Sequence, residues 1–470
     1  MSNPKRATPL DRFLGIFADV HPGEGVSAVL LMVNVFLLLT SYLLLKIVRE
    51  PLILAGGGAE LKSYSSAGQA ILLLIAVPVY GSLASRLPRK RLINTVTIFF
   101  AACLPVFYLL SRLDVPLGIA FFLWLGIFNM MIVAQFWAFA NDIYTTDEGK
   151  RLFPIVGFGA SAGAVAGSFI AGWLIAPLGV YQLMLVAAVV LAGSLVLTNL
   201  VDARERRRRE GHLSAPDTTA EMPAATTAEM RVATTGEMRA ATSGEQPVHK
   251  EGPFQLVFRN RYLLLIAFMI LVLNWVNTTG EYIVSRTVTD AAHAMGAAPG
   301  SPEEKVFIGQ FYASYTGIVN LAALVIQLFL VSRIVKYVGV KWGILILPLI
   351  ALSGYTVLAF FPVLAVVRWA KTAENATDYS LQNTLRHMLF LPTTRDQKYK
   401  AKQAIDSFFV RMGDVLSAVL VFVGTTYLAL RPQGFAQFNI LLVLVWLALA
   451  VLVGREFERR SSKVRQGEAG

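Results

Sequence analysis

Two blocks of about six apolar segments, each long enough to cross a membrane, flank one polar stretch from Asp202 to Pro253. The hydrocarbon core of a bilayer is roughly 30 Å thick, so a helix that crosses it needs about 20 apolar residues. The pattern predicts an all-α integral membrane protein with about twelve transmembrane helices in two six-helix pseudo-repeats. The predicted spans cover residues 27–48, 66–86, 92–111, 117–140, 153–176, 181–201, 262–284, 306–332, 342–361, 363–391, 403–429 and 435–454.

The same pattern predicts how the chain is divided. We expect a cytoplasmic N-terminus (1–26), a first half (27–201), a linker (202–253), a second half (254–454) and a cytoplasmic C-terminal tail (455–470). The linker contains an eight-residue repeat that starts at Thr218 with TTAEMPAA. A Thr-rich tract of small residues buries too little apolar surface to offset its conformational entropy. We therefore predict a disordered linker, a spacer in preference to a regulatory tether.

Composition and charge agree with a membrane protein. Apolar residues make up 55% of the 470 residues and charged residues 15%. The net charge of +12 comes from cations in loops and at span ends, where they orient a membrane protein, so we expect no nucleic-acid partner. The loops that follow even-numbered spans hold the clusters 86–91 and 206–209. This asymmetry places both termini in the cytoplasm.

The loop Gly81-Ser82-Leu83-Ala84-Ser85-Arg86-Leu87-Pro88-Arg89-Lys90 resembles the loop signature of the major facilitator superfamily. Ser85 replaces the usual acidic residue and Pro88 the usual glycine. Ser332-Arg333-Ile334-Val335-Lys336 lies at the matching place in the second half. The resemblance implies a duplicated transporter architecture.

Charges inside the predicted spans are the strongest physical clue to a site. An unpaired charge at the bilayer centre costs roughly 2.5 to 3.5 kcal/mol on insertion scales, so each should face protein or water. In the tenth span, Arg368, Lys371, Glu374, Asn375 and Asp378 form one helical stripe. We expect this stripe to face the central cavity or a tight helix interface. Lys371 and Glu374 either neutralise one another or contact a ligand.

Other charges lie in the first, seventh and eleventh spans. Lys46, Arg49 and Glu50 end the first span, where they form either an interfacial anchor or contacts for a phosphorylated substrate. Lys46 is our preferred contact for an anion, with Lys371 second. Glu281 is either a snorkelling carboxylate or, as we favour, a coupling or gating group. Arg411 and Asp414 are three residues apart, which predicts a helix-pairing role.

Several stretches resemble the ATP/ADP translocase family of plastids and intracellular bacteria. They are residues 45–50, 60–62, 137–142, 145–154, 156–160, 393–398 and 398–406. The resemblance implies a major facilitator fold, nucleotide exchange and, for this chain, a bacterial cytoplasmic membrane. Lys62, Glu281 and the triplet Lys398, Lys400 and Lys402 match residues of that family. The resemblance also makes Asp142, Lys150 and the triplet candidates for a cytoplasmic gate or anion contact. Leu125 stands where the exchangers carry an acid, and Ala401 replaces a glycine.

Motifs of other protein classes are absent from the sequence. No Gly-rich loop ends in Gly-Lys-Ser/Thr, which argues against a P-loop ATPase. The five histidines are scattered and no nucleophile lies beside a base, so we expect no catalytic residue, metal or cofactor. Gly157, Gly159, Gly163 and Gly167 predict close helix packing in the fifth span.

The sequence thus predicts a secondary transporter that moves an anionic, phosphorylated solute, with nucleotide as the leading candidate. Its partners would be that solute and the lipid bilayer. One alternative is a proton-coupled carrier of another organic anion or drug, which the residue Leu125 favours. A second alternative is a transporter-like sensor or scaffold that moves nothing. The sequence does not determine the oligomeric state.

Overall fold

The computed structural model describes residues 9–15, 19–22, 24–113, 115–144, 146–213, 253–394, 397 and 401–468. Every regular element in these ranges is a helix, as predicted. The linker repeats and the lysines at 398 and 400 lie outside them. The first half contains α1 (Pro9–Leu14), α2 (Gly25–Arg86), α3 (Arg89–Ser111), α4 (Gly118–Ile143), α5 (Thr146–Leu178) and α6 (Leu183–Leu213).

The second half begins with α8 (Pro253–Arg259), α9 (Arg261–Ala294) and α10 (Pro302–Phe329). It continues with α11 (Val331–Tyr337), α12 (Gly339–Gly343), α13 (Ile346–Phe360), α14 (Leu364–Thr377), the π-helix η1 (Asp378–Gln382) and α15 (Asn383–Met388). It ends with α16 (Lys402–Ala404), the π-helix η3 (Ile405–Phe409), α17 (Val410–Thr426) and α18 (Pro432–Glu468).

The helices match the predicted membrane spans, with two differences in how spans and helices correspond. In the described ranges, 10 helical stretches are long and apolar enough to cross a membrane. The first two predicted spans both lie in α2, which consists of two helices joined directly at a kink at Gly58, where φ is 73° and the backbone is not helical. The tenth predicted span is divided among α14, η1 and α15, and α14 has only 14 residues. The twelve predicted spans therefore correspond to 10 helical stretches of membrane length in the described ranges.

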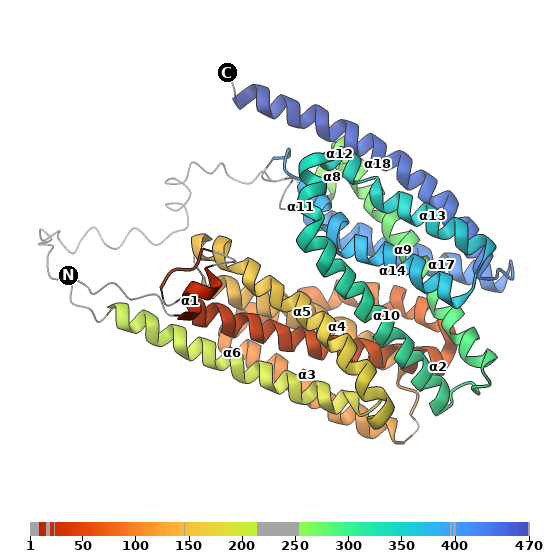
Figure 1. Ribbon diagram of the computed structural model, residues 1–470, viewed down its shortest axis with the longest axis horizontal. Coiled ribbons are helices and arrows are strands. Elements are labelled where there is room, and N and C mark those ends of the chain that lie inside the picture. Colours follow the sequence, from red (N-terminus) through yellow and green to blue (C-terminus); the bar gives the residue numbers. More distant parts are fainter. Residues whose placement is uncertain are drawn as a thin grey trace, which may run out of the picture.

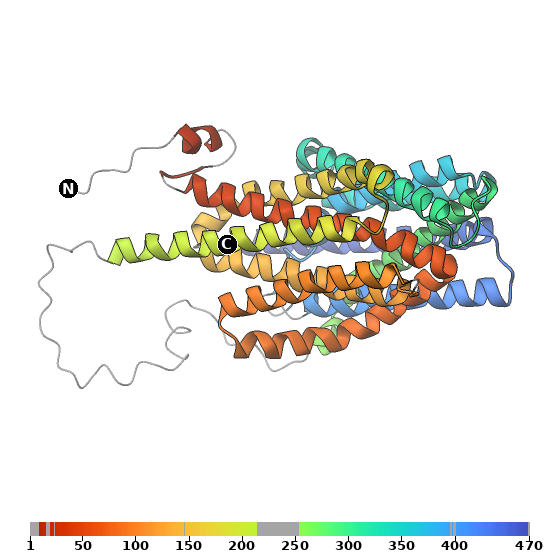
Figure 2. The same cartoon turned by 90° about the horizontal axis from the view of Figure 1, so that it is seen from below.

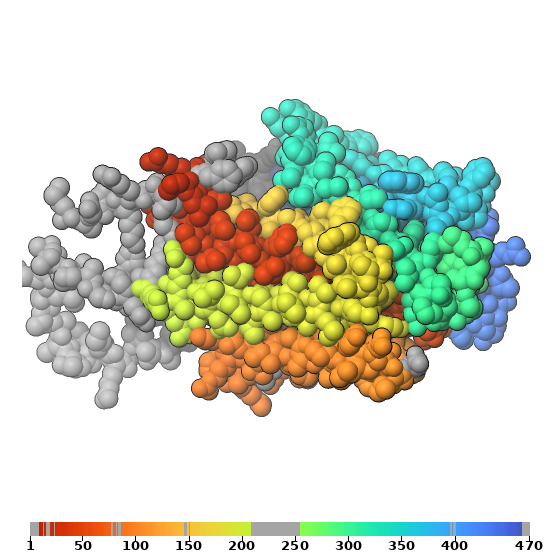
Figure 3. All heavy atoms as spheres, turned by 60° about the horizontal axis from the view of Figure 1, so that its bottom comes forward, coloured from red at the N-terminus to blue at the C-terminus, as the bar shows by residue number. Residues whose placement is uncertain are grey.

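The two halves form separate bundles that meet at one end. In Figure 1 the helices α2–α6 and α8–α18 converge around the bend in α2 and diverge toward the end where both termini lie. At the convergent end α5 packs against α10, and Asn320 donates a hydrogen bond to the Ala164 carbonyl at 3.4 Å. Figure 3 shows yellow atoms of α5 directly against green atoms of the second half. The molecule is therefore closed at the end away from its termini.

Glycines hold α5 tightly against α2 in the first half. A methyl group added at Gly159 or Gly163 would lie 2.4 Å from the carbonyl oxygen of Met32 or Phe36, and one at Gly167 2.8 Å from that of Thr40. Small residues are the usual means by which membrane helices approach closely. The predicted glycine packing is confirmed at these three positions. The fourth glycine of the stripe, at position 157, faces open space.

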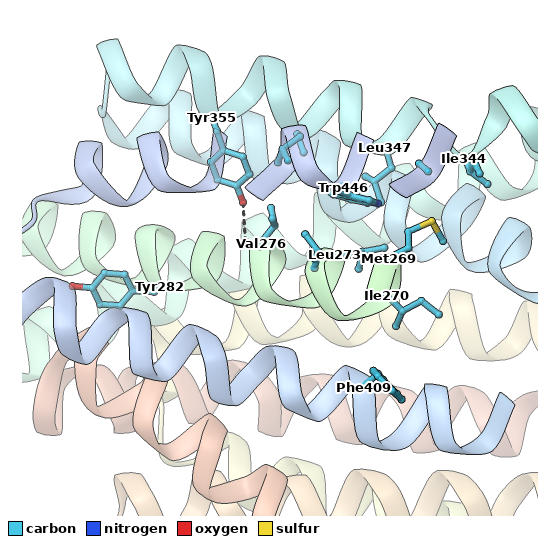
Figure 4. Close-up of a cluster of buried hydrophobic side chains, with 14 of the residues drawn as sticks. Met269, Ile270, Leu273, Val276, Tyr282, Ile344, Leu347, Tyr355, Phe409 and Trp446 are labelled. Atoms are coloured by element: carbon cyan, nitrogen blue, oxygen red, sulfur yellow. Dashed lines mark hydrogen bonds between the residues drawn. The ribbon is translucent and has the colours of Figure 1, made fainter. Parts of the chain in front are cut away.

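The second half has its own apolar core. Figure 4 shows Trp446 of α18 and Leu347 of α13 above Met269 and Leu273 of α9. Fully burying such a side chain contributes about 1.5–3 kcal/mol in water. In a bilayer that drive is weaker, and close packing carries more of the stability. This core fixes α9, which carries several residues of the site described below.

Two helices run past the membrane-length core. We expected the sixth span to end at 201, but α6 continues to Leu213 and projects beyond its neighbours in Figure 2. The extension is rich in Arg and Glu, which are good helix formers. Arg206 and Asp202 also pair at 3.1 Å with the i,i+4 spacing that stabilises a helix. In the second half, α18 extends in the same way to Glu468.

Candidate functional site

A cavity of about 260 Å³ lies where the two halves meet. From the first half it is lined by α2 and by Phe122 of α4, and from the second half by α9, α10, α14, η1 and α17. Its charged lining residues are Lys46, Arg49, Glu50, Lys62, Glu281, Arg411 and Asp414. All seven are residues that the sequence singled out. The cavity therefore collects predicted residues from segments far apart in the chain.

Glu50 pairs with two cations of α2, one of which lies across the kink. Its carboxylate pairs with Lys62 Nζ at 2.7 Å and with the neighbouring Arg49 guanidinium, which also lies 4.5 Å from the centre of the Phe122 ring. Lys62 Nζ reaches into the second half and donates to the hydroxyl oxygens of Ser285 at 2.9 Å and Tyr312 at 3.3 Å. Lys62 thus links the halves on the convergent side of the cavity.

Lys46 differs from the other cavity cations. It lies one helical turn before Glu50 on α2, is partly exposed, and lines the cavity beside Tyr42. Arg49, Lys62 and Arg411 each have a carboxylate within 4 Å. Among the described residues, Lys46 makes neither an ion pair nor a side-chain hydrogen bond. Its ammonium group is therefore available to a ligand.

The second half contributes a buried network behind the cavity wall. Lys371, 1% exposed, pairs with Glu374 at 2.9 Å and donates to Asn277 Oδ1 at 2.9 Å. Glu281 Oε1 lies 4.0 Å from Lys371 Nζ and accepts a hydrogen bond from Asn375 Nδ2 at 2.9 Å. Lys371 thus bridges one buried carboxylate and one that lines the cavity. Its pairing with Glu374 is one of the two roles the sequence left open.

Arg411 and Asp414 form an ion pair within α17. Their side chains lie 3.2 Å apart, in line with the predicted helix pairing. Asp414 Oδ1 also accepts hydrogen bonds from Asn274 Nδ2 at 2.9 Å and Thr278 Oγ1 at 2.8 Å, both on α9. Asp414 therefore joins α17 to α9 at the edge of the cavity.

Other predicted residues do not line this cavity. Asp378 begins η1, and Arg368 lies with its guanidinium carbon 5.8 Å from the centre of the Phe311 ring. Asp142 pairs with Arg89 at 3.2 Å, near the terminal end of the first half. Lys402 pairs with Asp406 at 2.6 Å. Lys398, Lys400 and the side chain of Lys150 lie outside the part of the chain that the structure describes.

Sequence reasoning predicted Asn375 but missed most of the uncharged lining of the cavity. Tyr42, Tyr312, Tyr315, Tyr379 and Gln69 all line it. Tyr42 precedes Lys46 by four residues, so helical spacing from a suspected charge would have found it. The tyrosines on α10 carry no such signal, because aromatic residues are common throughout membrane helices.

Comparison with known proteins gives the family. A family model described as "Major Facilitator Superfamily" matches residues 25–370. The chain belongs to this superfamily. It is therefore a secondary membrane transporter, and the predicted fold is confirmed.

Named relatives of this superfamily member are distant in sequence. ADP,ATP carrier protein 1 of Chlamydia pneumoniae is 21% identical over 383 residues, which cover 72% of this chain and 67% of that protein. ADP,ATP carrier protein 2 of Chlamydia pneumoniae is 22% identical, and the match covers 97% of this chain and 93% of that one. The predicted relationship to ATP/ADP translocases is confirmed at this distance.

Solved structures support the fold alone. A POT family transporter in complex with 5-aminolevulinic acid has a TM-score of 0.60 at 13% identity, with 97% of this chain and 100% of that chain covered. A variant of the nucleoside transporter NupG has a TM-score of 0.57 at 12% identity, with 92% and 99% covered.

Leu125 lies away from the cavity. It is 1% exposed and packs in the apolar core of the first half with Phe121 and Phe128. The cavity lining includes Phe122 of the same helix but not Leu125. The residue at the position where the resemblance to the exchangers implies an acid is thus part of the packing of α4.

Proposed function

We propose that this transporter moves an anionic, phosphorylated solute across a bacterial cytoplasmic membrane by alternating access, with nucleotide as the leading candidate. Both termini would lie in the cytoplasm. The observation that carries the proposal is Lys46, which lines the cavity between the halves and makes no ion pair or side-chain hydrogen bond with the described residues. The names of the ADP,ATP carrier relatives support the nucleotide class.

The chemistry of the cavity fits such a solute. A lysine ammonium is a mobile point charge suited to phosphate oxygens. At 4 Å and an effective dielectric constant of about 20, its attraction to one anionic charge is about 4 kcal/mol before desolvation costs. The rings of Tyr42, Tyr379 and Phe122 offer apolar surface for a planar group beside the charge. One cavity thus offers contacts for both parts of a nucleotide.

Alternating access would rearrange the charge pairs around this cavity. The halves are in contact at the end away from the termini, where Lys62 reaches Ser285 and Tyr312. An anion held at Lys46 would also attract Lys371, which already divides its charge between Glu374 and Glu281. We propose that substrate binding shifts these partners and that the shift accompanies rocking of the halves.

Counterflow in proteoliposomes tests the proposal. Vesicles preloaded with ATP should take up labelled ADP if the protein exchanges nucleotides. Lys46→Gln should lower the uptake at least tenfold, because among the described lining cations only Lys46 has no carboxylate within 4 Å. Lys336→Gln serves as the matched control, because Lys336 is exposed on α11 and does not line the cavity. Equal uptake by Lys46→Gln and the parent protein, at equal protein levels, would refute the role of Lys46.

A proton-coupled carrier of another organic anion or drug is the second candidate. Glu281 favours it, because this carboxylate lines the cavity, is 29% exposed and lies beside Lys371. A carboxylate in that position can exchange a proton with the cavity. Uptake driven by a pH gradient without internal nucleotide would support this function. The absence of any flux would support a sensor or scaffold.

A further inference from the structure

The charges around the cavity limit how many negative charges a substrate can bring. Four cations line it, namely Lys46, Arg49, Lys62 and Arg411, against the three carboxylates Glu50, Glu281 and Asp414. The net formal charge of the lining is therefore +1. Lys371 and Glu374 lie behind the wall as a pair and cancel each other. Counting this pair leaves the cavity at +1.

The carboxylates that reduce this charge are firmly held. Glu50 is 2.7 Å from Lys62 Nζ and also pairs with Arg49. Asp414 has three partners on two helices, at 2.8–3.2 Å. Removing either carboxylate from the cavity would break several bonds inside the membrane, where replacement by water is restricted. The cavity that a substrate enters therefore keeps a net charge close to +1.

We infer that the preferred substrate is a phosphomonoester such as a nucleoside monophosphate, and not a diphosphate or triphosphate. This inference rests on the proposed function and selects within its substrate class. A phosphomonoester carries about −1.5 to −2 at neutral pH, so at most about one negative charge exceeds the charge of the lining. Each further phosphate adds at least one more charge without a cationic partner in the described cavity.

The size of the cavity points in the same direction. Its volume of about 260 Å³ is below the roughly 300–1,000 Å³ typical of sites for drug-sized ligands. A small ligand with one charged group and one planar group matches the arrangement of Lys46 beside Tyr42 and Tyr379. Charge and volume are independent properties, and both favour the smaller nucleotide.

One substitution should change the preference for a monophosphate over a diphosphate. Asp414→Asn keeps the shape of the side chain and removes one negative charge, which raises the cavity to +2 and frees Arg411. Diphosphates should gain most from this change. Glu458→Gln is the matched control, because it removes a carboxylate of the same half that is exposed on α18 and pairs with Lys341.

The experiment is competition in counterflow, with AMP, ADP and ATP titrated without magnesium against uptake of labelled AMP in the full-length protein. AMP should inhibit at a concentration at least tenfold below that of ATP. Asp414→Asn should bring the inhibitory concentration of ADP about tenfold closer to that of AMP. Glu458→Gln should leave the ratio of these two inhibitory concentrations unchanged. Inhibition by ATP equal to or stronger than that by AMP overturns the inference and leaves the proposed function standing. If labelled AMP is not taken up but labelled ADP still enters ATP-loaded vesicles, the inference alone is overturned. If neither AMP nor ADP is taken up, the proposed function itself is overturned. If Asp414→Asn folds and its ratio of ADP to AMP inhibitory concentrations equals that of the parent protein, the inference is also overturned. If Asp414→Asn does not fold, the inhibitory concentrations of AMP and ATP in the parent protein decide the question.

Discussion

Replacing Gly280 by alanine should disturb the buried charge network from the back of α9. The added methyl group would lie 2.1 Å from the hydroxyl oxygen of Tyr355 and 2.8 Å from Lys371 Nζ. Lys371 can bend its flexible end, but the rigid Tyr355 ring must tilt. That tilt would weaken its hydrogen bonds to the Val276 carbonyl at 3.3 Å and to Glu374 at 3.4 Å.

The expected loss of stability follows from two opposing terms. Overpacking a filled interior costs about 1–3 kcal/mol. Alanine is favoured over glycine in a helix by about 1 kcal/mol, which offsets part of that cost. We therefore expect Gly280→Ala to destabilise the protein by up to about 2 kcal/mol. Gly157→Ala should stabilise it by up to about 1 kcal/mol, because nothing lies within 4 Å of the added methyl group.

Thermal unfolding of detergent-purified protein measures both effects. The double variant Gly280→Ala/Tyr355→Phe removes the hydroxyl oxygen that the methyl group would strike, so its loss should be smaller than the sum of the single losses by about 1 kcal/mol. The reasoning is refuted if Gly280→Ala unfolds at the same temperature as Gly157→Ala. It is also refuted if the double variant shows simple additivity.

Two further predictions concern contacts at opposite ends of the molecule. Burial alone would raise the pKa of Glu24, but its hydrogen bonds from Arg151 at 2.9 and 3.0 Å outweigh burial and hold that pKa below 4.5. Its stabilisation is therefore complete above about pH 4.5 and is lost as the pH falls through the lowered pKa, so the difference in Tm between the parent and Glu24→Gln should shrink on acidification. A difference in Tm that stays constant as the pH falls would argue against this role of Glu24. Glu60→Gln should weaken the 2.9 Å pair with Arg286 that joins the halves, by about 0.2–1 kcal/mol. Hydrogen exchange of residues 58–66 should then rise up to about fivefold, and unchanged exchange would contradict this role.

Sequence reasoning predicted the fold well because the membrane simplifies the problem. Segments of about 20 apolar residues must become helices, and the predicted spans lie within the observed helical stretches to within a few residues. The junction of the first two spans was predictable only in part. Three glycines in a row indicate a break, and the backbone at Gly58 is indeed not helical, but helical residues flank this kink directly and no loop separates the two spans. Lys62 on one side of this bend pairs with Glu50 on the other, a contact that spacing along the chain does not reveal.

The candidate site was predictable where a charged side chain inside the membrane needs a partner. It was unpredictable where tertiary packing decides the direction of a side chain. Lys371 and Glu374 had to find partners inside the membrane, and the structure pairs them. Asp378 belongs to the same predicted stripe but begins the π-helix η1, where the wider turn breaks the α-helical spacing. The direction of a side chain after such a turn depends on tertiary packing. The role of Gly280, which leaves room for Tyr355 and Lys371, likewise becomes visible only in three dimensions.

The ends of α6 and α18 extend beyond the two halves as helical arms, one on each half. From residue 201 to Leu213, α6 adds about 18 Å of helix at 1.5 Å per residue, and α18 adds a similar length beyond Gly454. Each arm continues a helix that belongs to a different half. A small rotation of one half against the other is therefore magnified into several ångströms at the tips. Probes attached to the two arms would read the motion of the transport cycle without touching the cavity that carries it.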